Sequence, residues 1–194
     1  KAFTTMTPEY AIQRAQQAEK EISSGKYRGP LHGIPYTLKD VIATQGIRTT
    51  FGNPRMIDFQ PQESATVHVL LEDAGAILLG KVYSHIGRGD NPVMCYSPWD
   101  PDTSPGTTSG GSGSAVASGM GLLSIGTDTG GSVRHPLPRP MGTAFRNRGP
   151  QLGRHGQAAG PNVGVLCDAR FPAAGPAWAV TNLGVLCDVA PSTA

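Results

Sequence analysis

The chain has 194 residues, enough for one medium-sized domain with a hydrophobic core. Charged residues make up 15% and hydrophobic residues 38%, with 26 glycines and 17 prolines, which favours a loop-rich globular protein and excludes a charge-rich disordered segment. The formal net charge of +2 is too small to indicate nucleic acid or an anionic membrane as a partner.

Three cysteines with no Cys-X-X-Cys pair argue against a disulfide framework or a zinc knuckle and favour a reducing compartment. No apolar run approaches the roughly 18 residues that a membrane-spanning helix needs. The chain opens on Lys1 without an initiator Met or a signal-peptide pattern, so we expect it to begin inside a longer protein. The cytoplasm is the expected location, and the sequence leaves a homodimer open.

Helix and strand signals alternate through the first half of the chain. Thr7-Pro8-Glu9 combines a hydroxyl N-cap, a proline at N1 and an acid in the first turn, which is typical of a helix start. Four elements are predicted in chain order: a helix from Thr7 to Gly25, a buried strand over 34–38, a second helix from Ser64 to Gly75, and a core strand over 77–79. This alternation predicts an α/β fold with helices packed on a sheet.

The second half of the chain changes character twice. Residues 102–131 are rich in Gly, Ser and Thr but keep apolar blocks, which predicts a tight loop, a helix, a strand and a second tight loop. Beyond Pro136 prolines are dense and no hydrophobic period emerges. A heptapeptide nearly repeats at Asn162–Asp168 and Asn182–Asp188, but two copies are too few for a solenoid.

Several short motifs match catalytic patterns only in part. Gly75–Lys81 fits GxxxxGK, but Val82 stands where a magnesium-binding Ser or Thr is needed, and the motif's interior is a hydrophobic strand. Ser23–Lys26 fits SxxK, yet it lies at the predicted end of a helix, where a lysine is ordinary. No serine satisfies GxSxG, and the histidines show no metal-binding spacing. We therefore expect neither a metal nor a cofactor.

Three other segments can supply the parts of a serine hydrolase. A serine hydroxyl needs a base, and a buried lysine can serve when its surroundings favour the neutral amine. Lys39 lies in an otherwise apolar stretch, although a strand-end lysine paired with Asp40 is the ordinary alternative. Gly126–Ser132 has two glycines before a serine, which lets successive N–H groups point into one cavity, as an oxyanion hole requires. Thr107–Ser112 is a second hydroxyl-rich glycine loop.

Together these segments resemble the amidase signature family. Gly29–Asp40 is similar to its lysine strand, Ser104–Ser112 to its PGGSSGGS loop, and Gly126–Pro136 to its nucleophile loop. The order and separations fit as well, and the resemblance extends over residues 1–136. It implies an α/β amidase-signature fold with a mixed central sheet flanked by helices. It also implies an amidase that cleaves small-molecule carboxamides through an acyl-enzyme.

The resemblance also implies residue roles. Ser132 is the expected nucleophile and Lys39 the expected base. The bridging hydroxyl, which the family takes from a serine at a cis peptide bond, falls here on Thr108, and the neighbouring Ser109 is expected to bind Lys39. The expected oxyanion hole consists of the backbone N–H groups of Thr129, Gly130, Gly131 and Ser132.

We expect residues 1–194 to form a single, incomplete amidase-signature domain. Residues 137–194 diverge from the family pattern, which indicates either a diverged or misread sequence or a chain that lacks much of its domain. Two alternatives to a simple amidase stay open. One is an amidotransferase A-type subunit of the same family, which passes ammonia to an acylated tRNA beside a partner chain. The other is a catalytically impaired member that acts only in binding.

Overall fold

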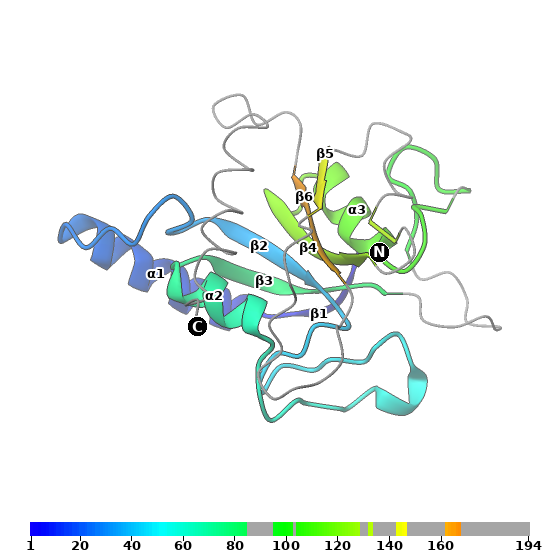
Figure 1. Ribbon diagram of the computed structural model, residues 1–194, viewed down its shortest axis with the longest axis horizontal. Helices are drawn as coiled ribbons and strands as arrows, with labels where there is room; N and C mark the ends of the chain where they lie inside the picture. The colour runs from blue at the N-terminus through cyan, green and yellow to red at the C-terminus, as the bar shows by residue number, and fades with distance from the viewer. Residues whose placement is uncertain (85–94, 103, 129–131, 134–142, 147–161, 168–194) are drawn as a thin grey trace, which may run out of the picture.

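The structure is a computed structural model that describes residues 1–84, 95–102, 104–128, 132–133, 143–146 and 162–167. Within this part of the chain, one mixed sheet has the strand order β1-β3-β2-β4-β6-β5 (Figure 1). Its strands are β1 (Phe3–Met6), β2 (Pro35–Lys39), β3 (Ile77–Val82), β4 (Leu123–Asp128), β5 (Thr143–Arg146) and β6 (Asn162–Cys167). The helices are α1 (Pro8–Ser23), the short 3-10 helix η1 (Pro54–Met56), α2 (Thr66–Asp73) and α3 (Gly110–Ala117).

The three strands at the centre of the sheet run parallel. β2 pairs with β3 on one side and with β4 on the other, so the carboxyl ends of all three strands meet at one edge. The outer pairings, β1 with β3, β4 with β6 and β6 with β5, are antiparallel. The predicted α/β fold with a mixed sheet and flanking helices is confirmed, and the parallel centre gives the fold one edge at which side chains from distant segments can converge.

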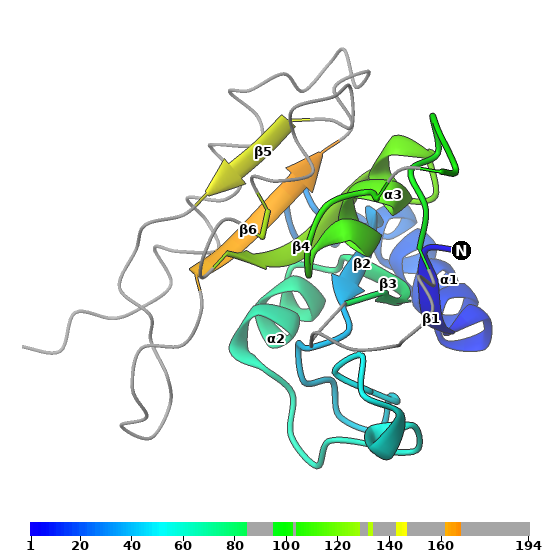
Figure 2. The same ribbon diagram turned by 90° about the vertical axis from the view of Figure 1, so that its right-hand side faces the viewer.

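Helices cover both faces of the central strands (Figures 1 and 2). On one face, Tyr36 and Leu38 of β2 pack in a core with Leu71 of α2. Helix α3 covers the other face. Val82 of β3, which lies opposite Lys39 in the pairing of β2 with β3, packs against Ala115 of that helix. Since side chains alternate along a strand, Lys39 points to the α3 face and its neighbour Leu38 to the α2 face.

The observed helix boundaries lie close to the predicted ones, whereas the predicted N-cap contacts are not found. Helix α1 begins at Pro8 after Thr7, as predicted, but the Thr7 hydroxyl donates to Leu78 O (3.2 Å) instead of capping a helix N–H. The prediction of Ser64 as a cap is wrong. Ala65 is the N-cap of α2, and Ser64 Oγ accepts from the Gln45 N–H (2.9 Å). Both hydroxyls, of Thr7 and of Ser64, instead form hydrogen bonds with backbone groups far away in the sequence. A local N-cap pattern does not predict such partners.

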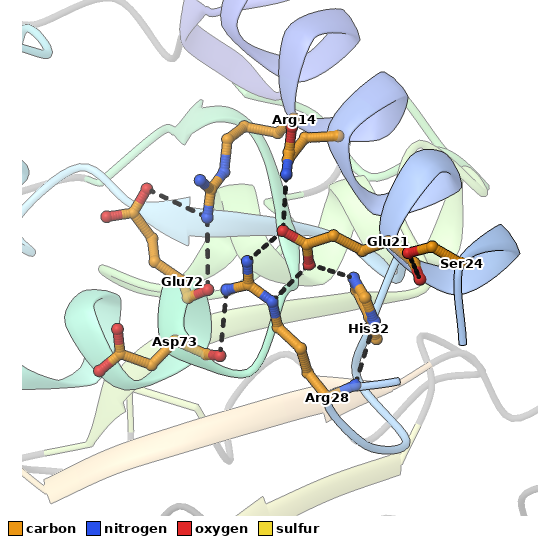
Figure 3. A network of polar contacts seen from close by, with 8 residues as sticks. Arg14, Glu21, Ser24, Arg28, His32, Glu72 and Asp73 are labelled. Atoms are coloured by element: carbon orange, nitrogen blue, oxygen red, sulfur yellow. Dashed lines mark hydrogen bonds and ion pairs between the residues drawn. The ribbon is translucent and has the colours of Figure 1, made fainter. Parts of the chain in front are cut away.

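A polar network joins α1, the turn that precedes β2, and α2 (Figure 3). Arg28 donates to both carboxylate oxygens of Glu21, each at 2.6 Å, and the His32 ring lies 3.3 Å from the same carboxylate. Arg14 on α1 donates to the Glu72 backbone carbonyl at 3.3 Å. Bidentate arginine–carboxylate contacts fix orientation as well as distance, so this network sets how the two helices approach the strand that ends at Lys39.

A buried histidine links the α2 face of the sheet to this network. The ring of His68, 3% exposed, shares a hydrogen bond of 2.8 Å with the Tyr36 hydroxyl through Nδ1. Its Nε2 lies 3.6 Å from a Glu72 carboxylate oxygen. Burial lowers the pKa of His68, although the charge of Glu72 opposes this. The neutral ring is therefore the form that the fold favours.

We predict that this histidine makes the fold sensitive to acid. Because the folded-state pKa lies below the ordinary value of about 6.5, the unfolded chain binds more protons between the two values. The free energy of unfolding therefore rises with pH in that window, and stability falls as the pH drops below about 6.5. Urea unfolding at pH 7.5 and pH 5.5 measures the effect. A His68→Gln variant is expected to lose less stability on acidification than the wild type, and equal losses would contradict the assignment.

Gly111 fixes how closely α3 approaches the sheet. A Cβ at this position would lie 2.4 Å from the Tyr83 carbonyl oxygen and 2.5 Å from its nitrogen. Real side chains do not tolerate such distances to backbone atoms. The absence of a side chain at Gly111 therefore allows the first turn of α3 to rest on the end of β3.

We expect Gly111→Ala to destabilise the chain by about 1–3 kcal/mol, the usual cost of overpacking, even though alanine is the better helix former. Gly110→Ala is the matched control in the same helical turn. There the added Cβ meets the Pro105 ring at 3.0 Å, and a side-chain ring can shift where backbone cannot. Denaturant unfolding of both variants checks this. Equal stability losses would mean that the Tyr83 contact is not the constraint.

Candidate active site

The site is built around a buried lysine. Lys39, the last residue of β2, is 2% exposed, and its Nζ contacts three hydroxyl groups. The distances are 2.8 Å to Thr108 Oγ1, 3.1 Å to Ser109 Oγ and 2.7 Å to Thr127 Oγ1. A buried amine needs such partners because it has lost its contacts with water. The predicted contact between Ser109 and Lys39 is present.

These hydroxyls come from two segments that the sheet brings beside Lys39. Thr127 lies on β4, which runs parallel to β2 in the register Leu38 opposite Ile125. Thr108 and Ser109 directly precede α3. A Cβ on Gly126 would lie 3.1 Å from Ser109 Oγ, so this glycine leaves the space that the serine hydroxyl occupies.

Ser109 ties the start of α3 to β4. Its hydroxyl donates to Thr127 O (3.1 Å) and accepts from the Thr127 N–H (3.4 Å). A hydroxyl carries a single proton, and here that proton is committed to Thr127 O. Ser109 can therefore only accept from Lys39, so it holds one N–H of the lysine in place.

Ser132 completes the cluster. Its Oγ lies 2.8 Å from Thr108 Oγ1, which itself lies 2.8 Å from Lys39 Nζ. The serine is partly exposed, whereas the next residue, Val133, is buried in a small core with Val116 of α3. Ser132, Thr108 and Lys39 thus form one continuous chain of hydrogen-bonding groups that leads from a partly exposed serine to a buried amine.

The structure brings together four residues that the sequence singles out: Lys39, Thr108, Ser109 and Ser132. Of the predicted oxyanion hole, Thr129, Gly130 and Gly131 lie outside the described residues. No peptide bond between described residues is cis, so the cis bond implied for the bridging residue is not found.

Thr127 is a member of the cluster that the sequence did not identify. It lies inside the Gly126–Ser132 motif, and its hydroxyl has the shortest of the three contacts with Lys39. A threonine five positions before Ser132 carries no signal of its own. Only the parallel pairing of β2 and β4 places it beside the lysine.

Asp40 has a structural partner elsewhere. Its carboxylate accepts from the Thr50 N–H (3.2 Å) and from the Thr50 hydroxyl (2.5 Å). Burial raises the pKa of Asp40, and the Thr50 hydroxyl and the charge of Lys81 oppose that effect. The carboxylate is thus held by the loop that follows β2.

Neither metal ligands nor a membrane-spanning helix is found in the described part of the chain. No three His, Cys, Asp or Glu side chains gather there into a group that could hold a metal ion. No described helix has the length and apolarity needed to cross a bilayer.

Comparison with known proteins gives the same family from a family model and from individual relatives. Residues 1–137 match the family model described as Amidase. The chain is 37% identical over 195 residues to the A-type subunit of the glutamyl-tRNA(Gln) amidotransferase from Chloroflexus aurantiacus, covering 97% of this chain and 39% of that relative. The chain thus spans well under half of that protein's length.

Solved structures share the fold. One described as an amidase is 31% identical with a TM-score of 0.72, covering 96% of this chain and 44% of that one. The native peptide amidase of Stenotrophomonas maltophilia is 32% identical with a TM-score of 0.66, over 75% of this chain and 31% of that one. The family model covers more than half of the chain, and the chain belongs to the amidase signature family, whose members act on amide C–N bonds.

Proposed function

We propose that this chain carries the centre of a serine amidase, which hydrolyses a carboxamide C–N bond to an acid and ammonia or an amine. The observation that supports this most directly is the hydrogen-bonded chain from Ser132 Oγ through Thr108 Oγ1 to Lys39 Nζ, with 2.8 Å at each step. In this proposal Ser132 is the nucleophile, Thr108 the proton bridge and Lys39 the base.

The surroundings of Lys39 favour this role for geometric reasons. A neutral amine has two N–H donors and one lone pair. Ser109 and Thr127 each offer an acceptor oxygen, at 3.1 and 2.7 Å. With these two hydroxyls accepting its N–H groups, the amine can direct its lone pair at Thr108 Oγ1, 2.8 Å away, and accept a proton from it.

The reaction then follows in two halves. Ser132 Oγ attacks the amide carbonyl carbon while its proton passes to Thr108 Oγ1, whose own proton passes to Lys39. The tetrahedral intermediate expels the amine, which takes the proton back along the same path, and leaves an ester on Ser132. Water attacks this acyl-enzyme by the same relay, releases the acid and restores the serine. We assign the oxyanion to the backbone N–H groups of residues 129–132 from the sequence motif.

A second candidate is an amidotransferase A-type subunit. It is favoured by the relatives named for that component of glutamyl-tRNA(Gln) amidotransferase, which reach 42% identity over 142 residues in Trichodesmium erythraeum. The same relay would then release ammonia from an amide donor for transfer to an acylated tRNA. The two candidates share the acyl-enzyme and differ in the fate of the ammonia.

We also propose that residues 1–194 form one domain. Strands β5 and β6, from the divergent part of the chain, extend the sheet that carries the site, because β6 pairs with β4 and β5 pairs with β6. A second, separate domain would not need to continue this sheet.

Labelling with a fluorophosphonate serine probe tests the assignment of the nucleophile and the base. We expect the wild type to be labelled and Ser132→Ala to remain unlabelled, because the reacting oxygen is gone. Lys39→Met keeps the volume but removes the base and is expected to slow labelling by about 10²–10⁴-fold. Equal labelling of Ser132→Ala and the wild type would disprove the nucleophile assignment.

The bridge is tested by a matched pair of variants at Thr108. Thr108→Ser keeps the hydroxyl and should label within a few-fold of the wild type. Thr108→Val keeps the branched shape but removes the hydroxyl, and should lose most of the rate because Ser132 is then cut off from Lys39. Similar rates for the two variants would exclude a relay through this position.

Ammonia release from glutamine and from a panel of simple carboxamides separates the two candidate functions. We expect release from simple carboxamides without any acceptor. Release from glutamine alone would favour the amidotransferase role. If the folded chain neither labels nor releases ammonia, the result would indicate a binding role instead.

A further inference from the structure

Lys81, a second buried lysine, lies behind the site and takes no part in the relay. It belongs to β3, where it is paired with Leu38 and so lies on the opposite face of the sheet from Lys39. Its side chain is 0% exposed. Among the described residues no carboxylate lies within ion-pair distance of its ammonium group.

All three protons of the Lys81 ammonium have acceptors in the segment that follows Lys39. Nζ donates to Ile42 O (2.5 Å), Thr49 Oγ1 (2.8 Å) and Thr44 Oγ1 (3.1 Å). These oxygens converge on the charge in the way that carbonyl and hydroxyl oxygens surround a bound cation. A buried ammonium is tolerated when it is fully hydrogen-bonded in this way.

The segment that encloses this cation is a closed loop, Asp40–Phe51. The Asp40 carboxylate binds Thr50, and the Phe51 N–H donates to Asp40 O at 2.9 Å, so the two ends of the loop meet. Asp40 is 0% exposed and is the acid whose charge acts on Lys81. Burial lowers the pKa of Lys81 to about 8, with Asp40 opposing that shift, so the ammonium form still prevails at pH 7.

Two hydrogen bonds connect Lys81 to the base of the relay. Lys81 Nζ donates to the Ile42 carbonyl, and the Ile42 N–H donates to Lys39 O at 3.0 Å. The Asp40 N–H donates to Val82 O at 2.9 Å, which anchors the same turn to β3. The backbone on the C-terminal side of Lys39 is thus fixed from the strand that carries Lys81.

We propose that Lys81 is a positioning residue for the reaction. Its ammonium serves as a built-in cation that keeps the Asp40–Phe51 loop closed and thereby sets where Lys39 presents its amine to Thr108. This inference rests on the proposed amidase function, since it concerns the base of that relay. A lysine fits here because the acceptors surround a single point, which suits a compact ammonium.

The test is the rate of fluorophosphonate labelling per folded molecule, separated into the maximal rate and the probe concentration at half saturation. Lys81→Met keeps the chain length of the side chain but removes the charge and the donors, and leaves Asp40 uncompensated. We expect its maximal rate to fall at least about tenfold with an unchanged half-saturation concentration, because the base shifts and Ser132 remains accessible. Lys26→Met, at an exposed lysine, should match the wild type.

Two further variants keep the test decisive if Lys81→Met does not fold. Thr44→Val removes one acceptor without burying or deleting a charge, and should lower the maximal rate a few-fold. Lys81→Ala should regain labelling with propylammonium, which can donate three hydrogen bonds, and not with tetramethylammonium, which can donate none.

The possible results separate this inference from the proposed function. A wild type that does not label at all contradicts the proposed function. A labelled wild type, together with a folded Lys81→Met or Thr44→Val that reaches the wild-type maximal rate, overturns the role of Lys81 alone. Equal rescue by the two amines would likewise overturn it, because charge without hydrogen bonding would then suffice.

Discussion

The burial of the Lys39 amine is the constraint on which the rest of the site depends. A lysine that is 2% exposed has lost its water contacts, and the fold must supply replacements. Hydroxyl groups of Thr108, Ser109 and Thr127 supply three of these replacements. These hydroxyl groups can each donate or accept a hydrogen bond, which suits the proposed role of Lys39 as a base that gains and loses a proton.

The parallel pairing of β3, β2 and β4 makes this arrangement possible. Each strand brings its carboxyl end to the same edge, where Lys39 and Thr127 meet across β2 and β4. Helix α3 is drawn onto this edge because Gly111 lets its first turn touch the Tyr83 backbone, and this places Thr108 and Ser109 over the lysine. The polar network of Arg28, Glu21 and Arg14 holds the helices on the opposite face (Figure 3).

Two lysines on neighbouring strands illustrate how environment divides their roles. Lys39 and Lys81 are both buried, and they point to opposite faces of the sheet. Lys81 is enclosed by a carbonyl and two hydroxyls of one closed loop, which suits a permanent cation. Lys39 instead contacts a hydroxyl that leads on to Ser132. Strand position alone does not distinguish the two environments, since both lysines lie at or next to the end of a hydrophobic strand.

From the sequence alone we could predict α1, β2, α2, β3, α3 and β4 in their order, the α/β class and the motifs that hold Lys39, Thr108, Ser109 and Ser132, because periodicity, turn residues and motif spacing are local properties of the chain. The same local signals did not predict β1, β5 or β6. The tertiary structure decided the contacts of Thr127 with Lys39, of Ser64 with Gln45 and of Lys81 with its loop, together with the pairing of β1 with β3. Each of these contacts joins residues far apart in the chain. Such contacts depend on the pairing register of the strands, which the local sequence does not specify. The hydroxyl chain from Ser132 to Lys39 has the same origin, since its members come from three segments that only the fold makes neighbours.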